Sequence, residues 1–396
     1  MNLFILPSWY PSNSSKTSGL FIRDQVEALA NLDPTINVIV SLWGHAECAL
    51  SIRNFWMWPK KIAWRLRQKS NSITKKDNLY EILNPKITWS DRFPFGGVRQ
   101  LINVNRRNFL VAQEKFGKID LIHAHVSYPG GFIAAQLSHE FNVPYVLTEH
   151  MGPFPFENLI INGRPLPEIT TAFMQSKANI AVSDSLAKRL LTFGYDARYV
   201  IPNVVDERRF NFELPSSRKI IFFTLCKMIE LKGVEHLLKS IALWNPPASH
   251  IEFRIAGDGP KLSKFKAMTT QLGLSDRVSW LGAICPTDVP KMMNECHIFI
   301  LPSTHETFGV VYAEAIASGK PVIATRCGGP ESIINQGNGL LVNVGDIEGL
   351  SLAMQNLSNN LSDYDSLFIR RDFENRFSRR AVVDQLKSLY NEVLRK

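Results

Sequence analysis

The sequence lacks the features that mark several classes of protein. Its five cysteines are scattered, with no CxxC pair and no regular spacing, which argues against a disulfide framework and favours reduced thiols in a cytosolic setting. No run approaches the roughly 18 apolar residues of a membrane span. The apolar stretch at residues 3–6 is too short for the core of a signal peptide. Internal repeats and low-complexity tracts are also missing, so we expect an ordinary globular protein of the cytoplasm.

Length and charge narrow the class further. At 396 residues the chain is long for a single hydrophobic core, so two domains are expected. Lysine and arginine number 45 against 36 aspartate and glutamate residues, which gives a net charge of +9. Such a balance favours anionic partners, namely phosphates, acidic lipid headgroups or nucleic acid.

Short apolar runs alternate with segments of helical periodicity. Residues 2–6 predict a buried strand, residues 8–18 a loop, residues 20–29 a helix and residues 36–42 a second strand. This β–loop–α–β order begins a parallel α/β sheet. The pattern restarts at residue 219, after a polar linker. We therefore predict two doubly wound domains, residues 1–205 and 206–374, followed by an amphipathic helix over residues 375–396.

In the first domain, two predicted strands end at histidines. His125 closes the strand at residues 119–125, and His150 follows the strand at residues 143–147. The carboxyl ends of parallel strands are where open α/β sheets bind ligands. Gly19, where the first loop meets the first helix, would let a ligand approach the backbone, although taken alone a plain tight turn explains it slightly better. A metal held by His123, His125 and His150 is the weaker alternative, because no further ligand set follows; we expect no metal.

The second domain is organised around residues 304–319. Glu306 and Glu314 lie eight positions apart, and between them Thr307, Phe308 and Gly309 form a turn that opens onto a helix. A helix start after a strand and a glycine loop directs backbone N–H groups at one spot and favours an anion, most often a phosphate. With carboxylates beside it, the site suits a phosphorylated sugar. The alternative is a βα unit with two solvated glutamates.

Residues 53–76 interrupt the α/β rhythm with eight lysines or arginines, three tryptophans and no acidic residue. Phe55, Trp58, Ile62 and Leu66 fall at helical spacing. A cationic helix with a bulky apolar face can lie in the interface of an anionic membrane. The alternatives are a helix packed on its own domain and a nucleic-acid patch; because nothing else resembles a nucleic-acid-binding module, we expect no nucleic acid.

Several of these motifs resemble those of glycosyltransferase family 4. Glu306-x7-Glu314, within HETFGVVYAEAIASGKPVIAT, resembles the family's EX7E motif, and KMIELKG at residues 227–233 resembles its RLxxxKG phosphate motif. IAGDGP, LPSTHE, CGGPESI and GNGLLV resemble landmarks of its second domain, DLIHAHVSYPGG its first-domain histidine motif, and IPNVVD its hinge.

The resemblance implies a GT-B fold, with two Rossmann-like domains facing across a cleft and the terminal helix returning to the first domain. It also implies retaining, metal-independent transfer of a sugar from a nucleotide diphosphate sugar to an acceptor hydroxyl, with no cofactor. By the same resemblance the catalytic residues are His125 near the reacting carbon, Lys227 and Lys232 on the diphosphate and Glu306 on the donor sugar. The donor-binding residues are Gly19, Thr307, Phe308, Gly309 and Glu314, and His150 lies on the acceptor side.

This chain departs from the family pattern at three positions. Lys227 stands where arginine is usual, Cys226 where glycine is usual, and Val204 where the hinge usually has glycine. Lysine keeps the charge without the bidentate fork, so we expect an active enzyme. We interpret it as a transferase at the inner face of the membrane, acting on a lipid-linked or polysaccharide acceptor in lipopolysaccharide or capsule synthesis. A nucleotide-sugar 2-epimerase and a non-catalytic nucleotide-sugar-binding protein are the alternatives.

Overall fold

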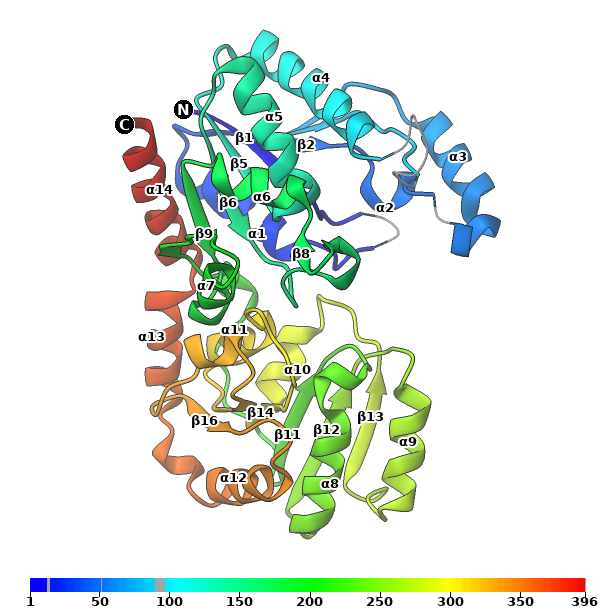
Figure 1. Cartoon of the computed structure of the whole chain (residues 1–396). Coiled ribbons are helices and arrows are strands. Elements are labelled where there is room, and N and C mark those ends of the chain that lie inside the picture. Colours follow the sequence, from blue (N-terminus) through cyan, green and yellow to red (C-terminus); the bar gives the residue numbers. More distant parts are fainter. Residues whose placement is uncertain (13–14, 51, 90–96, 396) are drawn as a thin grey trace. The chain divides into compact units, whose positions relative to one another are not determined.

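The computed structural model describes residues 1–12, 15–50, 52–89 and 97–395. The chain forms two compact units (Figure 1). The first comprises Met1–Val182, Ala187–Val204 and Val382–Lys396, and the second comprises Ser183–Leu186 and Val205–Ala381. The chain therefore leaves the first unit between Val204 and Val205, within the segment predicted to be a linker, and its last helix belongs mostly to the first unit.

The first unit is built on one sheet, with the strand order β10-β9-β6-β5-β1-β2-β4-β3 over the described residues. All neighbours are parallel except β3 and β4. The strands are β1 (Asn2–Pro7), β2 (Asn37–Leu42), β3 (Ser72–Lys76), β4 (Leu79–Leu83), β5 (Leu121–His125), β6 (Tyr145–Glu149), β9 (Ala178–Ala181) and β10 (Tyr199–Val200), with a separate hairpin of β7 (Ile160–Ile161) and β8 (Arg164–Pro165). The helices are α1 (Leu20–Leu32), α2 (His45–Cys48), α3 (Trp58–Arg67), α4 (Val98–Phe116), α5 (Phe132–Phe141), α6 (Pro167–Met174), most of α7 (Asp184–Leu191) and most of α14 (Arg379–Arg395).

Strand β1 shows why this sheet is covered on both faces. Leu3 and Ile5 belong to a buried cluster that includes residues of α1 and α14, whereas Phe4 contacts Phe109 of α4 at 5.1 Å between ring centroids. Successive strand residues point to opposite faces, so a strand that is apolar throughout is buried from both sides. The continuous apolar run at the start of the sequence is therefore the centre of the first core.

The second unit has a parallel sheet with the order β13-β12-β11-β14-β15-β16 over the described residues. Its strands are β11 (Ile220–Leu225), β12 (Ile251–Ala256), β13 (Val278–Gly282), β14 (Ile298–Leu301), β15 (Val322–Thr325) and β16 (Gly339–Val342). The helices are α8 (Val234–Trp244), α9 (Leu262–Gln271), α10 (Val289–Glu295), α11 (Val310–Ala317), α12 (Ile347–Asn359) and α13 (Ser366–Arg376). The prediction of two doubly wound α/β domains is thus confirmed.

Helices occupy only part of two segments for which the sequence predicts helical structure. Residues 53–76 form a 3₁₀ turn (Ile52–Met57), then α3, then strand β3. Asn71 has a positive φ of 57°, which turns the chain so that Ile73 pairs with Ile82 of β4. Most of the predicted helix over residues 375–396 is α14, which begins at Arg379, where the Ser378 hydroxyl accepts from Ala381 N. The first two residues of the prediction belong to the end of α13, and residue 396 lies outside the described residues.

Candidate functional site

Several predicted site residues lie at the carboxyl ends of the two neighbouring strands between which each sheet reverses its strand order. In the first unit β1 lies next to β5, with Pro7 opposite His125, and later strands continue outward on either side. In the second unit β11 lies next to β14 in the same way. Such a switch point opens a crevice at the carboxyl ends of the strands, where ligands bind. His125 ends β5, Lys227 follows β11, and Glu306 follows β14.

Three buried histidines stack at the first switch point. The rings of His123 and His125 lie 4.3 Å apart and those of His125 and His150 lie 5.3 Å apart. His123 has both ring nitrogens on hydroxyl groups, with Nδ1 2.6 Å from the Tyr390 hydroxyl and Nε2 2.8 Å from Thr148 Oγ1. Nδ1 of His125 lies 3.0 Å from Nε2 of His150. The hydroxyl of Tyr390 on α14 thus helps to hold the cluster in place.

Burial keeps these imidazoles neutral. It lowers the pKa of His123 to about 3, and burial together with His123 lowers the pKa of His150 to about 3. Burial, with His123 and His150 nearby, also holds the pKa of His125 well below its usual value. At neutral pH the cluster therefore provides one N–H donor and one lone pair per ring. Among the described residues, no group of three or more His, Cys, Asp or Glu side chains is arranged to hold a metal ion.

The backbone after His125 is held by a buried carboxylate that the sequence patterns did not single out. Glu149 accepts hydrogen bonds from the N–H groups of Ser127, His150 and Met151 at 2.8–3.0 Å. Burial raises the pKa of this carboxyl group, and the three backbone donors oppose that rise. Val126 has φ +71°, a strained value for a β-branched residue. Strain fixed by surrounding hydrogen bonds is common where a chain must present a side chain in one position.

His150 and Gly19 have structural partners within the first unit. His150 is 8% exposed, lies against Phe21 with 4.7 Å between ring centroids, and is hydrogen-bonded to His125. Gly19 begins α1 with φ +67°, and a Cβ there would lie 2.4 Å from the carbonyl oxygen of Trp9. The chain's own first loop therefore requires this glycine, and its contact with a donor stays a prediction.

At the second switch point a lysine and a glutamate form a tight pair. Lys232 Nζ lies 2.6 Å from Glu306 Oε1, and the two side chains are 23% and 11% exposed. The Ser303 hydroxyl donates to the same oxygen at 2.7 Å. Lys227 is exposed and has no ion-pair partner among the described residues. This edge of the sheet thus presents one paired and one accessible ammonium group.

Close backbone approaches hold the loop that carries Glu306. The N–H of Gly329 donates to Glu306 O at 2.7 Å, and a Cβ on Gly329 would lie 2.3 Å from Phe308 O. Likewise, a Cβ on Gly328 would lie 2.6 Å from Glu306 O. The glycine pair in CGGP is therefore what lets this turn lie against the 306–308 loop.

The remaining predicted donor residues contribute mainly through the backbone. Gly309 has φ +87° and precedes α11. The Phe308 side chain is buried against Phe377, with 5.8 Å between ring centroids, and the Thr307 carbonyl accepts from Ser183 Oγ at 2.5 Å. Glu314 is half-buried in the second turn of α11. The side chain of Phe308 is thus part of the core, which leaves its peptide group for any role in binding.

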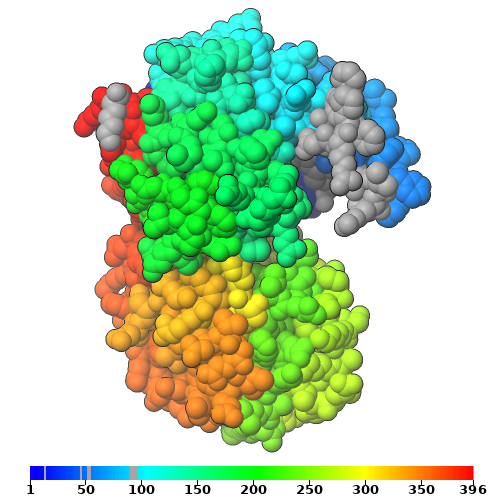
Figure 2. Space-filling model, viewed as in Figure 1, coloured from blue at the N-terminus to red at the C-terminus, as the bar shows by residue number. Residues whose placement is uncertain are grey.

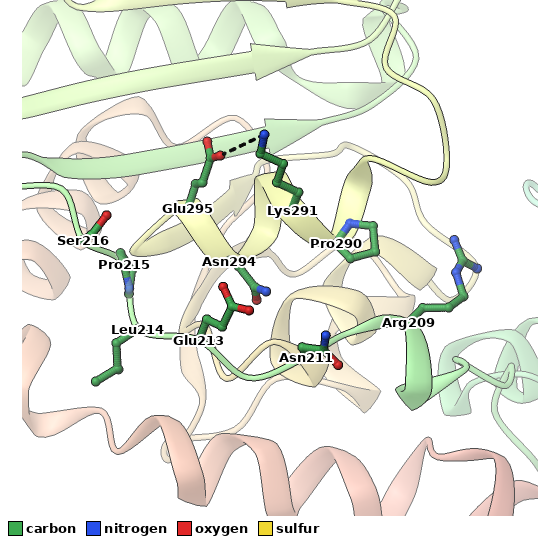
Figure 3. Close-up of a pocket in the computed structure, with 10 residues that line it drawn as sticks. All are labelled: Arg209, Asn211, Glu213, Leu214, Pro215, Ser216, Pro290, Lys291, Asn294 and Glu295. Carbon is green, nitrogen blue, oxygen red and sulfur yellow. Dashed lines mark ion pairs between the residues drawn. The ribbon is translucent and has the colours of Figure 1, made fainter.

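The second unit also contains a hollow of about 350 Å³ outside this edge (Figure 3). It lies between residues 209–216 and α10, and its rim carries the Lys291–Glu295 pair at 4.0 Å. None of the predicted site residues lines it. Because neither Lys232 nor Glu306 lines it, this hollow and the predicted donor site are different features.

Comparisons with known proteins identify the class. Residues 76–209 match the family described as Glycosyltransferase Family 4, and residues 205–369 match Glycosyl transferases group 1. An uncharacterized glycosyltransferase of Methanocaldococcus jannaschii is 28% identical over 76% of this chain and 82% of its own length. A lipopolysaccharide core biosynthesis glycosyltransferase of Rhizobium meliloti is 27% identical over 55% of this chain and 65% of its own.

Solved structures agree on the fold. HepE from Anabaena, in complex with UDP, superposes with a TM-score of 0.71 at 20% identity, covering 99% of both chains; its complex with UDP-glucose gives 0.68. The architecture is of the GT-B type, as predicted. The chain belongs to glycosyltransferase family 4 and is a glycosyltransferase by family.

The basic segment of the first unit forms an exposed surface. Phe55, Trp56 and Leu66 are 64%, 65% and 79% exposed, and α3 has no buried residue within its described length. The segment lies at the outside of its unit, in blue (Figures 1 and 2). No described helix has both the length and the apolar character needed to cross a bilayer. Lys61 Nζ on α3 also donates to the carbonyl oxygen of Ala49 at 2.5 Å, so this helix contacts its own unit, and its binding to a membrane stays a prediction.

Proposed function

We propose that the protein is a retaining, metal-independent glycosyltransferase that moves a sugar from a nucleoside diphosphate sugar to a hydroxyl of a lipid-linked or polysaccharide acceptor. The observation that carries this proposal is the Lys232–Glu306 pair at the switch point of the second sheet, with Lys227 on the same loop after β11 as Lys232. Ammonium groups suit a diphosphate, and a carboxylate next to them suits sugar hydroxyls.

The proposed chemistry transfers charge toward these lysines. The bond between the anomeric carbon and the phosphate oxygen breaks, and the sugar becomes oxocarbenium-like. Negative charge grows on the leaving diphosphate, where Lys227, Lys232 and the N–H groups at the start of α11 stabilise it more than the ground state. The acceptor hydroxyl attacks from the same face and gives its proton to the departing phosphate. His125 contacts the sugar near the reacting carbon, as the family resemblance assigns.

Relatives supply the context for the substrate. One relative is a lipopolysaccharide core biosynthesis glycosyltransferase, and HepE has been solved in complex with UDP and with UDP-glucose. We therefore propose a uridine diphosphate sugar as the first donor to test and a cell-surface polysaccharide or its lipid-linked precursor as the acceptor, with transfer on the cytoplasmic side of the membrane.

A donor screen tests the function directly. We expect UDP and one UDP-sugar to raise the melting temperature, because a ligand at 100 times its Kd adds about 2.7 kcal/mol to stability. The same donor should be turned over, with UDP released faster when an acceptor extract is present. A panel of nucleotide sugars that neither stabilises the protein nor releases nucleotide would contradict the proposal. Interconversion of the donor sugar without an acceptor would instead identify an epimerase. Nucleotide binding by the wild type, together with full function of Glu306→Ala in a functional assay, would identify a non-catalytic protein.

We further propose that the exposed surface around α3 binds anionic membrane. Lys60, Lys61 and Arg65 lie on the same short helix as exposed Ile62 and Leu66. Cations near an anionic surface contribute about 1 kcal/mol each, and apolar side chains enter the headgroup region. The combination of charge and exposed apolar area supports a lipid surface over an acidic protein.

Reversing the three cations to glutamate should weaken sedimentation with phosphatidylserine or phosphatidylglycerol vesicles by at least about 100-fold, given roughly 1 kcal/mol for each cation removed. High salt should weaken wild-type binding as well. The matched control reverses three cations of the second unit, Arg218, Lys266 and Lys291, and should bind as wild type does. Equal loss in both triple variants would show that net charge alone, rather than this surface, governs association.

A further inference from the structure

A hollow in the first unit lies beside α3. It has a volume of about 200 Å³ and is lined by Arg65, Lys86, Ile87, Trp89 and Gln100. Its lining side chains include two cations and no acidic group. The hollow of the second unit differs, because its charged side chains are of both signs. The first-unit hollow therefore favours an anion.

Three separate elements supply the polar side chains of the first-unit hollow. Arg65 is on α3, Lys86 follows β4, and Gln100 lies in the first turn of α4. The N–H of Lys86 donates to Trp43 O at 3.1 Å, so the segment after β4 is held by its neighbour in the chain fold. A ligand would thus meet groups whose backbone is already ordered, which lowers the cost of binding.

The polar groups that can face this hollow are all hydrogen-bond donors. The Arg65 guanidinium hydrogen-bonds to two neutral oxygens, Gln68 O at 3.5 Å and Ser70 Oγ at 3.3 Å, neither of which balances its charge. Lys86 is exposed and has no ion-pair partner among the described residues. The amide oxygen of Gln100 is buried, which leaves the amide nitrogen as the end of that group that can meet a ligand. Guanidinium, ammonium and amide nitrogens donate and do not accept.

We propose that the first-unit hollow binds a phosphate monoester, the terminal phosphate of a lipid headgroup or of a phosphorylated sugar. Such a phosphate carries a charge of about −1.5 to −2 at neutral pH and three strong acceptor oxygens. Two cations match that charge, and three donor groups match the oxygens. A phosphate diester has a single charge and two free oxygens, so it uses the site only in part. The volume is below the roughly 300–1,000 Å³ of sites for drug-sized ligands, which suits one charged group with its neighbouring atoms.

The hollow lies toward the same edge of the sheet as His125. In the register of β5, β1, β2 and β4, Leu83 at the end of β4 falls in the same row as His125 at the end of β5. Three strand spacings, about 14 Å, separate the two strands. Lys86 follows shortly after Leu83, beyond that edge. That the bound phosphate belongs to the acceptor rests on the proposed function, whereas the phosphate site itself does not.

Vesicles separate a phosphate site from general attraction to negative charge. Phosphatidic acid offers a monoester and phosphatidylglycerol a diester, and the two are compared in vesicles of equal zeta potential. We expect wild type to bind phosphatidic acid at least about fivefold more tightly, because it forms a further hydrogen bond to a charged group. The preference should shrink as falling pH returns the monoester to a single charge. Equal binding of the two lipids at neutral pH would overturn the proposal.

Matched single substitutions assign the preference to the hollow. Lys86→Gln and Lys60→Gln each remove one cation, but Lys60 lies on α3 and does not line the hollow. We expect Lys60→Gln to weaken binding to both lipids and keep the preference, and Lys86→Gln to abolish the preference. Gln100→Leu removes the amide donor without a change in charge and should lower the preference, with a cooperative melting transition. A preference that survives both Lys86→Gln and Gln100→Leu, or that Lys60→Gln lowers equally, would contradict the assignment.

Soluble probes identify the carrier of the phosphate. Glucose-6-phosphate and glycerol-3-phosphate contain the monoester without acyl chains. Displacement of the protein from phosphatidic acid vesicles by glucose-6-phosphate, and less by glycerol-3-phosphate, would support a phosphorylated sugar. Displacement by neither, with the lipid preference intact, would support a headgroup held at the membrane surface. Because these measurements need no sugar donor, their result is independent of the transfer assay.

Discussion

Lys232→Ala should lower the rate of sugar transfer by about 30- to 1000-fold, since a charge aimed at the leaving group contributes roughly 2–4 kcal/mol to the transition state. The side chain is mostly buried and its ammonium is fixed 2.6 Å from Glu306 Oε1. No other described lysine or arginine contacts that carboxylate. The loss should appear in kcat as well as in kcat/KM, because the charge on the diphosphate grows only as the bond breaks.

The partner substitution separates binding from catalysis. Glu306→Gln keeps an acceptor for the Ser303 hydroxyl but removes the charge that neutralises Lys232. We expect UDP to bind this variant at least as tightly as wild type while sugar transfer falls. Isothermal titration with UDP and a radiolabelled transfer assay measure the two effects. Lys239→Ala, which breaks an exposed pair with Glu235 on α8, is the control and should leave both unchanged. Transfer by Lys232→Ala within threefold of wild type would refute the assigned role.

The positions of the site residues could be predicted because they depend on chain order. Apolar runs identify β5, β11 and β14, and the ends of those strands hold His125, Lys227 and Glu306. Parallel α/β units put strand ends at one edge, so the sequence is sufficient to place these residues there. What they contact in space is a separate matter: the salt bridge of Glu306 with a lysine 74 positions away has no signal in the sequence.

Other features could not be predicted because they depend on three-dimensional proximity. Glu149 appeared as one more residue after a strand, yet its carboxylate joins three N–H groups around His125 and His150. The strand β3 was concealed by its lysines, which face solvent while Ile73 pairs with β4. A short edge strand rich in lysine has a composition close to that of a basic helix.

Gly233→Ala should destabilise the second unit far more than a typical glycine replacement. Gly233 ends the 3₁₀ turn Glu230–Lys232 with φ +64°, and a Cβ there would lie 1.8 Å from the carbonyl oxygen of Pro302. Backbone on both sides of this contact cannot move independently, because Pro302 directly follows β14. The matched control is Gly273→Ala, with φ +66° and open space around its Cβ. The control should cost about 1–2 kcal/mol for the left-handed conformation alone.

The difference between the two variants measures the close approach by itself. Urea denaturation, with midpoints compared at equal slope, should give Gly233→Ala a free energy of unfolding at least about 2 kcal/mol below that of Gly273→Ala. This difference exceeds the effect of most single substitutions. The contact also fixes Lys232 and the segment leading to Glu306, on either side of the clash, so UDP affinity should fall in Gly233→Ala and remain unchanged in Gly273→Ala. Equal stability of the two variants would show that the Pro302 carbonyl moves freely. The 2.6 Å pair of Lys232 and Glu306 would then not depend on this glycine.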